Sequence, residues 1–184
     1  MNYDELSEVE KHYFTLYKSN EDSFAYLLND YLRSKDDFIK YYGGAIKFLD
    51  SIISKSVLPE DIVLHRATVD TCIAPYISGT RYNNPEYLSS GADLKSVQIH
   101  FTDPNNPAYV KYICAKGMNA AHFETNSSFD DLEKEMLLGR NNEFEVIDNR
   151  ITEEKKEIEA IMTKFKSIGV RALKIYTFKW VRKM

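Results

Sequence analysis

The hydrophobic spacing of this 184-residue chain changes once, near Pro59, and that change limits its fold more than any other feature. Before Pro59, apolar residues recur at helical spacing and predict helices over about 6–17, 24–32 and 38–53. After it, short runs rich in β-branched and aromatic residues predict strands, as at 62–67, 109–114 and 144–147. The sequence therefore predicts a single α+β domain over residues 1–184, with a helical N-terminal part (1–58) and a largely antiparallel β core (59–184).

Glycine, proline and asparagine interrupt residues 78–93, which are predicted to be mostly loop with a short strand at 87–88. The pattern over 94–101 fits a helix or a strand equally well. A charged helix is predicted from Thr152 to about Lys166, and a long strand over 170–181 closes the chain.

Composition argues against several classes of protein. No window reaches the roughly 18 consecutive apolar residues that a membrane span requires, and a net charge of -4 argues against nucleic acid as a partner. Cys72 and Cys114 stand apart and are predicted to be reduced core thiols, and four scattered histidines predict no metal site. The acidic N-terminus lacks a signal-peptide pattern. We expect a monomer that is cytoplasmic or is delivered into a host cytosol, without contact to membrane.

Two carboxylates, Glu133 and Glu135, stand directly before the apolar run Met136-Leu137-Leu138. An unbroken apolar run is typical of a strand buried on both sides, and residues two apart in a strand share one face. The pair is thus predicted at the mouth of a rigid core strand, which is the support that a catalytic pair needs. Alone the pattern carries little weight, because Glu-x-Glu recurs at 8–10, 143–145 and 157–159 and is commonly solvated surface.

Four stretches give the acidic pair a context, and they occur in a fixed order along the chain. They are Asn29-Asp30-Tyr31-Leu32-Arg33, Ile62-Val63-Leu64-His65-Arg66-Ala67, Tyr87-Leu88-Ser89-Ser90-Gly91 and Glu133-Lys134-Glu135-Met136-Leu137-Leu138-Gly139-Arg140. Together they resemble the arginine-serine-glutamate class of mono-ADP-ribosyltransferases, which includes clostridial exoenzymes and host-modifying transferases of T-even phages. The resemblance extends from about Phe24 to Ile147. It implies two packed β-sheets with an NAD cleft between them, flanked by the N-terminal helices.

Three positions depart from the pattern of that class. Gly91 stands where the last residue of a Ser-Thr-Ser stretch is expected, Ala67 where glycine often follows the arginine, and Gly139 where proline often precedes the terminal arginine. The first departure bears on activity, because it leaves Ser89 as the leading serine and allows another alignment of that loop.

The resemblance also implies roles for particular residues. Glu135, Glu133 and Ser89 are expected to be catalytic, with Glu135 bound to a ribose hydroxyl of NAD, Glu133 orienting the nucleophile and Ser89 bracing the site. Arg66 is expected to bind the phosphates, and His65, Ser89, Ser90 and Glu135 to complete the NAD site. Phe129 is expected to contact the substrate protein. For Arg66 a structural ion pair, and for Phe129 simple burial, are the alternatives.

The chemistry agrees with these roles. Cleavage of the nicotinamide-ribose bond leaves an oxocarbenium-like sugar, which a fixed carboxylate stabilises as its positive charge develops. A glutamate at 133, where some relatives have glutamine, resembles the arginine-modifying members. We therefore expect an enzyme that transfers ADP-ribose from NAD to arginine of a target protein. The alternatives are NAD hydrolysis, another acceptor such as a nucleic-acid base, and a non-catalytic binding module.

Overall fold

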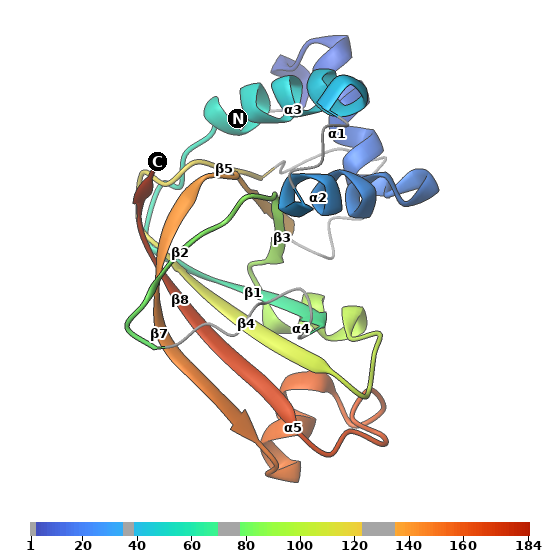
Figure 1. The fold of residues 1–184 in the computed structure, drawn as a ribbon, viewed down its shortest axis with the longest axis vertical. Coiled ribbons are helices and arrows are strands. Elements are labelled where there is room, and N and C mark those ends of the chain that lie inside the picture. Colours follow the sequence, from blue (N-terminus) through green and yellow to red (C-terminus); the bar gives the residue numbers. More distant parts are fainter. Residues whose placement is uncertain (1–2, 35–38, 70–77, 123–134) are drawn as a thin grey trace.

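The computed structural model describes residues 3–34, 39–69, 78–122 and 135–184. Three helices come first: α1 (Glu8–Ser19), α2 (Phe24–Ser34) and α3 (Ile39–Ser54). The strands follow, interrupted by the short helix α4 (Leu94–Val97) and by α5 (Lys155–Met162) (Figure 1). The α+β class predicted from the sequence is confirmed. None of the helices in these ranges is long and apolar enough to cross a membrane.

The strands form one hydrogen-bonded sheet in the order β2-β7-β8-β4-β1-β3-β6-β5. Their bounds are β1 (Ile62–Val69), β2 (Arg81–Asn83), β3 (Leu88–Gly91), β4 (Pro107–Cys114), β5 (Ala120–Ala121), β6 (Glu135–Leu138), β7 (Asn142–Thr152) and β8 (Leu173–Lys183). Every described pairing is antiparallel except that of β4 with β8. Between β1 and β3 the register contains one residue pair, His65 with Gly91. The sheet is therefore a five-stranded part and a three-stranded part that meet at a single pair.

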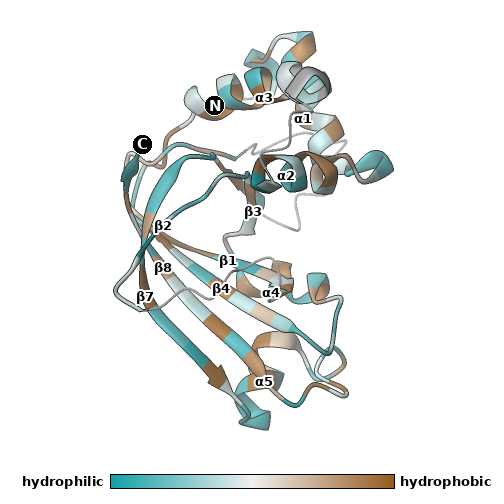
Figure 2. Ribbon diagram, viewed as in Figure 1, coloured by the Kyte–Doolittle hydropathy of each residue, from teal (hydrophilic) through white to brown (hydrophobic). Residues whose placement is uncertain are grey.

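One core lies between the two parts of the sheet. Leu64, Tyr112 and Phe178 of the larger part and Leu88 and Leu138 of the smaller part belong to the same buried cluster. A second cluster joins the smaller part to the N-terminal helices, through residues such as Leu137 and Leu49. Figure 2 shows the apolar stretches of the three helices and of the strands that supply these clusters. The smaller part is thus buried on both faces, which agrees with the unbroken apolar run 136–138.

Several elements differ in extent from the sequence predictions. Residues 78–93 contain two strands, β2 and β3, and 94–100 are helical. β7 runs on to Thr152, which is buried and pairs with Leu173, so α5 begins later than expected. It also ends earlier, at Met162, because Thr163 has a φ of 69°, which no helix residue adopts.

Cys114 is a buried free thiol, as predicted, and burial raises its pKa to about 12. Cys72 lies outside the described residues.

Glu10 connects α1 to α3. Its carboxylate accepts hydrogen bonds from the backbone and hydroxyl of Ser7, which close the capping box of α1. It also accepts a hydrogen bond from Ser51 Oγ at 2.9 Å and is paired with Lys55 Nζ, both at the C-terminal end of α3. The contact with Lys55, followed by those with Ser7 and Ser51, lowers the pKa of this buried carboxyl from 4.5 to about 2, although burial opposes the shift.

This depressed pKa predicts an acid-sensitive contribution to stability. Because the folded state binds the Glu10 proton more weakly than the unfolded state, the contribution is complete above about pH 4.5 and is lost as the pH falls towards 2. Glu10→Gln should therefore flatten the decline of the unfolding free energy between about pH 6 and about pH 2.5, measured by urea denaturation. The exposed Glu8→Gln is the matched control. If the unfolding free energy of the wild type and of Glu10→Gln falls equally with pH, Glu10 does not make this contribution.

Asn29 fixes α2 to the segment that leads into β3. Its side-chain amide donates to Tyr17 Oη at 3.0 Å and to the Tyr87 carbonyl at 3.1 Å, and its Oδ1 accepts from the Tyr87 N–H at 3.1 Å. All three residues are buried. A buried N–H without a partner is costly, so this one side chain determines how α2 sits on β3.

Asn29→Ala should lower the unfolding free energy by about 2–3 kcal/mol, because it leaves the Tyr87 N–H and carbonyl buried without these partners. The measurement is urea denaturation followed by circular dichroism. Asn106→Ala, in an exposed turn, should change the same quantity by no more than about 0.5 kcal/mol. A similar small loss for Asn29→Ala would show that water replaces the missing partners.

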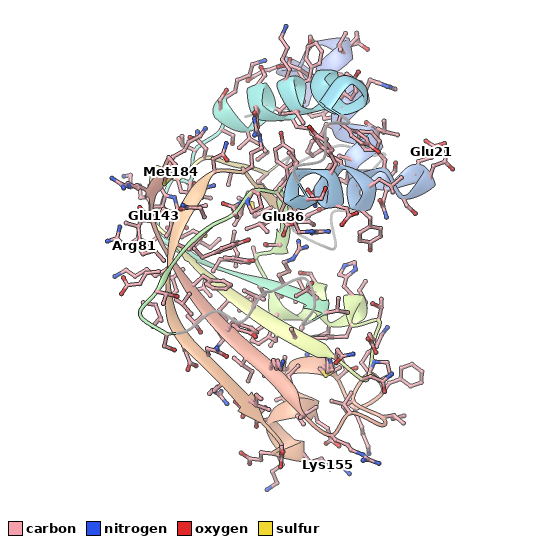
Figure 3. The ribbon with its side chains drawn as sticks, viewed as in Figure 1. Glu21, Arg81, Glu86, Glu143, Lys155 and Met184 are labelled. Carbon is pink, nitrogen blue, oxygen red and sulfur yellow. The ribbon has the colours of Figure 1, made fainter. Side chains whose placement is uncertain are left out.

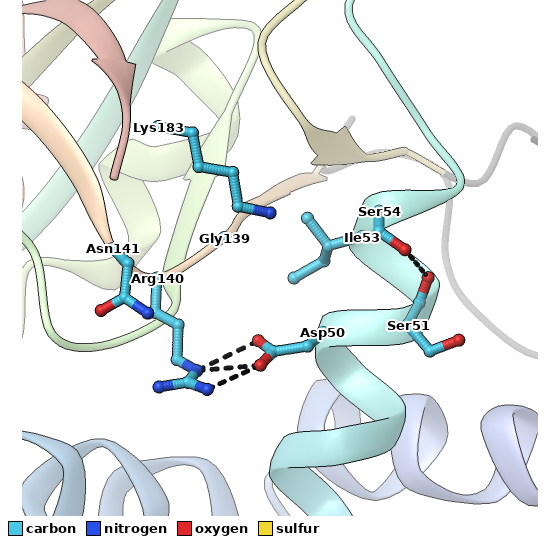
Figure 4. Close-up of a pocket in the computed structure, with 8 residues that line it drawn as sticks. All are labelled: Asp50, Ser51, Ile53, Ser54, Gly139, Arg140, Asn141 and Lys183. Atoms are coloured by element: carbon cyan, nitrogen blue, oxygen red, sulfur yellow. Dashed lines mark hydrogen bonds and ion pairs between the residues drawn. The ribbon is translucent and has the colours of Figure 1, made fainter.

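Arg140 ties the turn between β6 and β7 to α3. Its Nε lies 3.1 Å from both carboxylate oxygens of Asp50, and its Nη2 donates to Asp50 Oδ2 at 2.7 Å. The paired side chains line a pocket of about 310 Å³, which Lys183 also lines (Figure 4). Tyr87 Oη donates to the same carboxylate at 2.8 Å. The arginine that ends the Glu-x-Glu stretch is thus a structural anchor of the strand that carries Glu135.

Candidate active site

A cleft of about 500 Å³ lies between α1 and α2 on one side and β1, β3 and α4 on the other. This cleft is larger than the pocket beside Arg140. The residues that line it are Tyr17, Lys18, Asn20, Ala25, Tyr26, Asn29, Arg33, Arg66, Ala67, Thr68, Val69, Ser89, Ser90, Gly91, Ser96, Val97, His100, Thr102 and Glu135. Four of the residues predicted from the sequence are among them: Arg66, Ser89, Ser90 and Glu135. The structure therefore brings the arginine, serine and glutamate motifs to one cavity.

Ser89 and Glu135 are joined by a hydrogen bond. The register of β3 with β6 sets Ser89 opposite Leu137 and Gly91 opposite Glu135, so Ser89 and Glu135 are diagonal neighbours on one face. Ser89 Oγ donates to Glu135 Oε1. The hydroxyl fixes the direction of the carboxylate, which is the bracing role expected of the leading serine.

Arg66 reaches the same place from β1. Its Nη1 donates to the Ser89 carbonyl at 2.7 Å. This bond lies one residue from the single pair that joins β1 to β3, so it reinforces the junction between the two parts of the sheet. The guanidinium also lines the cleft, where its planar fork suits an anion.

Two further cations line the cleft, and both come from the helices. Lys18 Nζ lies 3.6 Å from Glu135 Oε2. Arg33 is paired with Glu86 and lies 3.7 Å from Asp30. Glu86 is buried beside α2 (Figure 3), and desolvation raises the pKa of its carboxyl, a shift that Arg33 and Arg66 oppose.

Sequence reasoning did not single out Lys18 or Glu86 as site residues. Neither belongs to a spaced motif, and Lys18 is one of 24 lysines and arginines. The sequence did point to Asn29 and Arg33, because they begin and end the helical stretch that resembles a motif of the family. The three-dimensional arrangement was needed to show that both face the cleft.

His65 does not reach the cleft. Successive residues of a strand point to opposite faces, so the His65 side chain points away from that of Arg66, and His65 is not among the residues that line the cleft. His65 Nδ1 lies 2.6 Å from Tyr109 Oη, and the two rings are stacked with their centroids 6.0 Å apart. Burial, and then the nearby Lys111, lower the pKa of the imidazole. This placement does not favour the predicted contact of His65 with NAD.

Ser90 is buried within the cleft wall, and its Oγ has no hydrogen-bond partner among the described residues. Glu133 and Phe129 lie outside the described residues, so their roles stay predictions. The described ranges contain no group of three or more His, Cys, Asp or Glu side chains that could hold a metal ion.

Gly91 has a structural reason for replacing serine. A Cβ at this position would lie against Ser96 Oγ and 2.8 Å from Val97 Cγ1, both on α4. Real Cβ atoms do not approach other atoms so closely, so a serine here would require the side chains of Ser96 and Val97 to shift. Ser96 Oγ, which donates to the Asp93 carbonyl at 2.6 Å, occupies the space next to the cleft that a larger residue 91 would take.

Solved structures of several known proteins are similar to this fold. Plx2a, an ADP-ribosyltransferase toxin from Paenibacillus larvae, is 18% identical, with a TM-score of 0.70 over 96% of this chain and 87% of that chain. The C3 exoenzyme of Clostridium limosum is 19% identical, with a TM-score of 0.69 over 98% and 88%. C3stau2 from S. aureus, solved with NAD, is 18% identical, with a TM-score of 0.67 over 97% and 89%. No curated protein matches the chain.

The fold is that of the ADP-ribosyltransferase toxins. The model of the ADP-ribosyltransferase exoenzyme family matches residues 1–168, and the chain belongs to that family. It is therefore an NAD-dependent ADP-ribosyltransferase, and NAD is its substrate rather than a resident cofactor.

Arg66→Ala should weaken NAD binding by about 1.5–3 kcal/mol, because we expect its guanidinium to form charged hydrogen bonds with the diphosphate. Arg66→Lys should recover only part of this loss, since an ammonium keeps the charge without the planar fork. Calorimetric titration with NAD measures the dissociation constant, and thermal melting checks folding. Arg81→Ala, which removes an arginine outside the cleft lining, is the control. An unchanged dissociation constant would leave Arg66 with its structural role alone.

Proposed function

We propose that this protein transfers ADP-ribose from NAD to an arginine side chain of a target protein. The observation that carries the proposal is the hydrogen bond from Ser89 Oγ to Glu135 Oε1, within a cleft that Arg66 also lines. It gives a carboxylate of fixed direction next to a guanidinium suited to phosphate. Family membership supplies the reaction, and this geometry supports the residues that perform it.

The reaction breaks the bond between the ribose C1 and the nicotinamide nitrogen, and the nicotinamide leaves with the bonding electron pair. Positive charge then develops on the ribose. Glu135 is placed to stabilise that charge, and it does so without reorganising because Ser89 already holds it. A guanidine nitrogen of the acceptor attacks C1 and loses a proton, for which Glu133 is the proposed acceptor.

The cleft also supports binding of the NAD diphosphate. Lys18, Arg33 and Arg66 line it, and of the described carboxylates only Glu135 does. This excess of positive charge in a partly enclosed space favours an anionic ligand. We assign the diphosphate to the side of Arg33 and Arg66 and the nicotinamide ribose to the side of Glu135.

The choice of a protein arginine rests on the residue at position 133. A second carboxylate can attract and deprotonate a guanidinium, whereas hydrolysis needs only water.

We further infer that the chain acts as a single-domain monomer in the cytosol of a target cell. Light scattering of the purified protein tests the oligomeric state.

Incubation with biotin-labelled NAD tests the acceptor. Extracts of animal and bacterial cells serve as protein acceptors, agmatine serves as a small guanidinium acceptor, and mass spectrometry locates the modified residue. Labelled protein on arginine together with modified agmatine is the expected result. Nicotinamide release without either product would identify an NAD hydrolase. Absence of NAD binding by calorimetry would identify a non-catalytic binding module.

The two glutamates should differ in their effect on this reaction. Glu135→Gln should remove at least about a hundredfold of turnover in both transfer and hydrolysis while NAD affinity changes little, since its charge is needed chiefly in the transition state. Glu133→Gln should abolish arginine modification and leave much of the slow hydrolysis, because water needs less orientation than guanidinium. Nicotinamide release and agmatine modification are measured in the same samples.

Glu145→Gln is the matched control, because it removes a carboxylate of β7 that does not line the cleft. Thermal melting checks that each variant is folded. If Glu133→Gln and Glu135→Gln lose hydrolysis and transfer to the same extent, Glu133 belongs to the NAD site and the proposed division of roles is wrong.

A further inference from the structure

Two of the most exposed apolar side chains in the described part of the chain belong to one turn. Phe165 is 78% exposed and Ile168 is 70% exposed, in the turn that follows α5. Ile99, which is 59% exposed, lies in the 3-10 helix η4 (Gln98–His100). Two hydrogen bonds hold that segment against the turn region, Gln98 Nε2 to the Ala160 carbonyl at 3.1 Å and Lys166 Nζ to the Phe101 carbonyl at 3.1 Å. We call Ile99, Phe165 and Ile168 the turn patch.

The turn holds its shape through its own hydrogen bonds. Ser167 N donates to the Thr163 carbonyl at 3.0 Å, and Val170 N donates to the Ser167 carbonyl at 3.1 Å. Ser167 Oγ also donates to the Lys164 carbonyl at 3.0 Å. Val170 packs on the buried cluster beneath the turn. A surface that is already ordered loses little conformational entropy when a partner covers it, so the exposed Phe165 and Ile168 are well placed to bind.

Basic residues flank the turn along the sequence. Lys164, Lys166 and Arg171 flank Phe165 and Ile168, and the sequence contains no Asp or Glu after Glu159. The chain as a whole has a net charge of -4, so this region differs in sign from the molecule. Apolar side chains framed by cations complement a surface that carries apolar and acidic groups.

One member of the turn patch, Ile99, lies next to the cleft lining. Ile99 is followed by His100, and both His100 and Thr102 line the cleft on either side of Phe101. A protein whose side chain enters a cleft covers roughly 800 Å² of surface around that point in a standard interface. A footprint of that size extends beyond the lining residues, and the segment that carries His100 is hydrogen-bonded to the turn through Lys166.

We propose that the turn patch, with Lys164, Lys166 and Arg171, docks an acidic and apolar face of the protein that receives ADP-ribose. This inference rests on the proposed transfer to a protein. It adds a second contact, outside the NAD site, that selects the target protein and holds it while its acceptor side chain occupies the cleft. A membrane surface is a different occupant, and the contiguity with the cleft favours the protein.

The test combines Phe165→Ser with Ile168→Ser in one variant. Label transfer from biotin-labelled NAD to the proteins of a cell extract, at limiting extract, should fall by at least about tenfold, because exposed aromatic and apolar anchors carry much of the energy of such interfaces. Nicotinamide release without added protein should stay unchanged, since neither residue lines the cleft. Ile147→Ser with Ile151→Ser, which changes two exposed apolar residues of β7, is the matched control.

A second variant, Lys164→Glu with Arg171→Glu, tests the charge. It should reduce protein labelling at low salt more than at high salt, again with unchanged nicotinamide release. Thermal melting shows whether each variant is folded, and the two variants alter different side chains, so a folding defect in one leaves the other informative.

The outcomes separate the docking proposal from the proposed function. Labelling of extract proteins at the wild-type rate by both folded variants overturns the docking role and leaves the transferase assignment intact. Nicotinamide release by the wild type without any labelled protein overturns the protein acceptor, and the docking role with it. Wild-type labelling combined with a loss of binding to phosphatidylcholine vesicles containing roughly 30% phosphatidylserine assigns the turn patch to a lipid surface and overturns the proposal.

Discussion

The junction of the two parts of the sheet, at the pair His65 and Gly91, sets the geometry of the cleft. β1 pairs with β4 over its whole length, and β3 pairs with β6 over all four of its residues, so each part is well ordered by itself. Few backbone hydrogen bonds join the five-stranded part of the sheet to the three-stranded part. The hydrogen bond from Arg66 to the Ser89 carbonyl supplies a side-chain link beside that pair, and the shared apolar core supplies the remaining contact. The arginine and serine motifs therefore support the fold at the point where they form the site.

The charges of the cleft explain why the helices are needed. Glu86 is buried, and burying an ionised carboxylate without partners is costly. Arg33 from α2 pairs with it, and Lys18 from α1 lies near Glu135. Each helix thus brings one cation to a carboxylate of the β core. The arrangement couples the packing of the helices to the electrostatics of the cleft, so a change in either alters the other.

Periodicity in the sequence was sufficient to predict the α+β class, the three N-terminal helices and most of the strands. It failed where tertiary contacts decide, as for β2, whose Tyr82 packs on the main core, and for the late start of α5, where Thr152 continues β7. Among the site residues, the neighbours His65 and Arg66 were both assigned to NAD. Strand alternation predicts that their side chains point to opposite faces, and of the two only Arg66 lines the cleft. Lys18 could not have been found, because it belongs to no motif and its role depends on how α1 sits over β6.

The departure at Gly91 illustrates why a motif has to be judged in three dimensions. By sequence it is a missing serine and counts against activity. In the structure, Ser96 Oγ on α4 takes up the room next to the cleft that a side chain at 91 would need. A hydroxyl is therefore still present at that part of the wall, supplied by another element. The two carboxylate oxygens of Glu135 then have distinct partners, because Ser89 binds Oε1 and Lys18 lies near Oε2. A carboxylate oxygen accepts more than one hydrogen bond, so the ribose hydroxyl that we expect at Glu135 can bind Oε1 beside Ser89 or Oε2 beside Lys18.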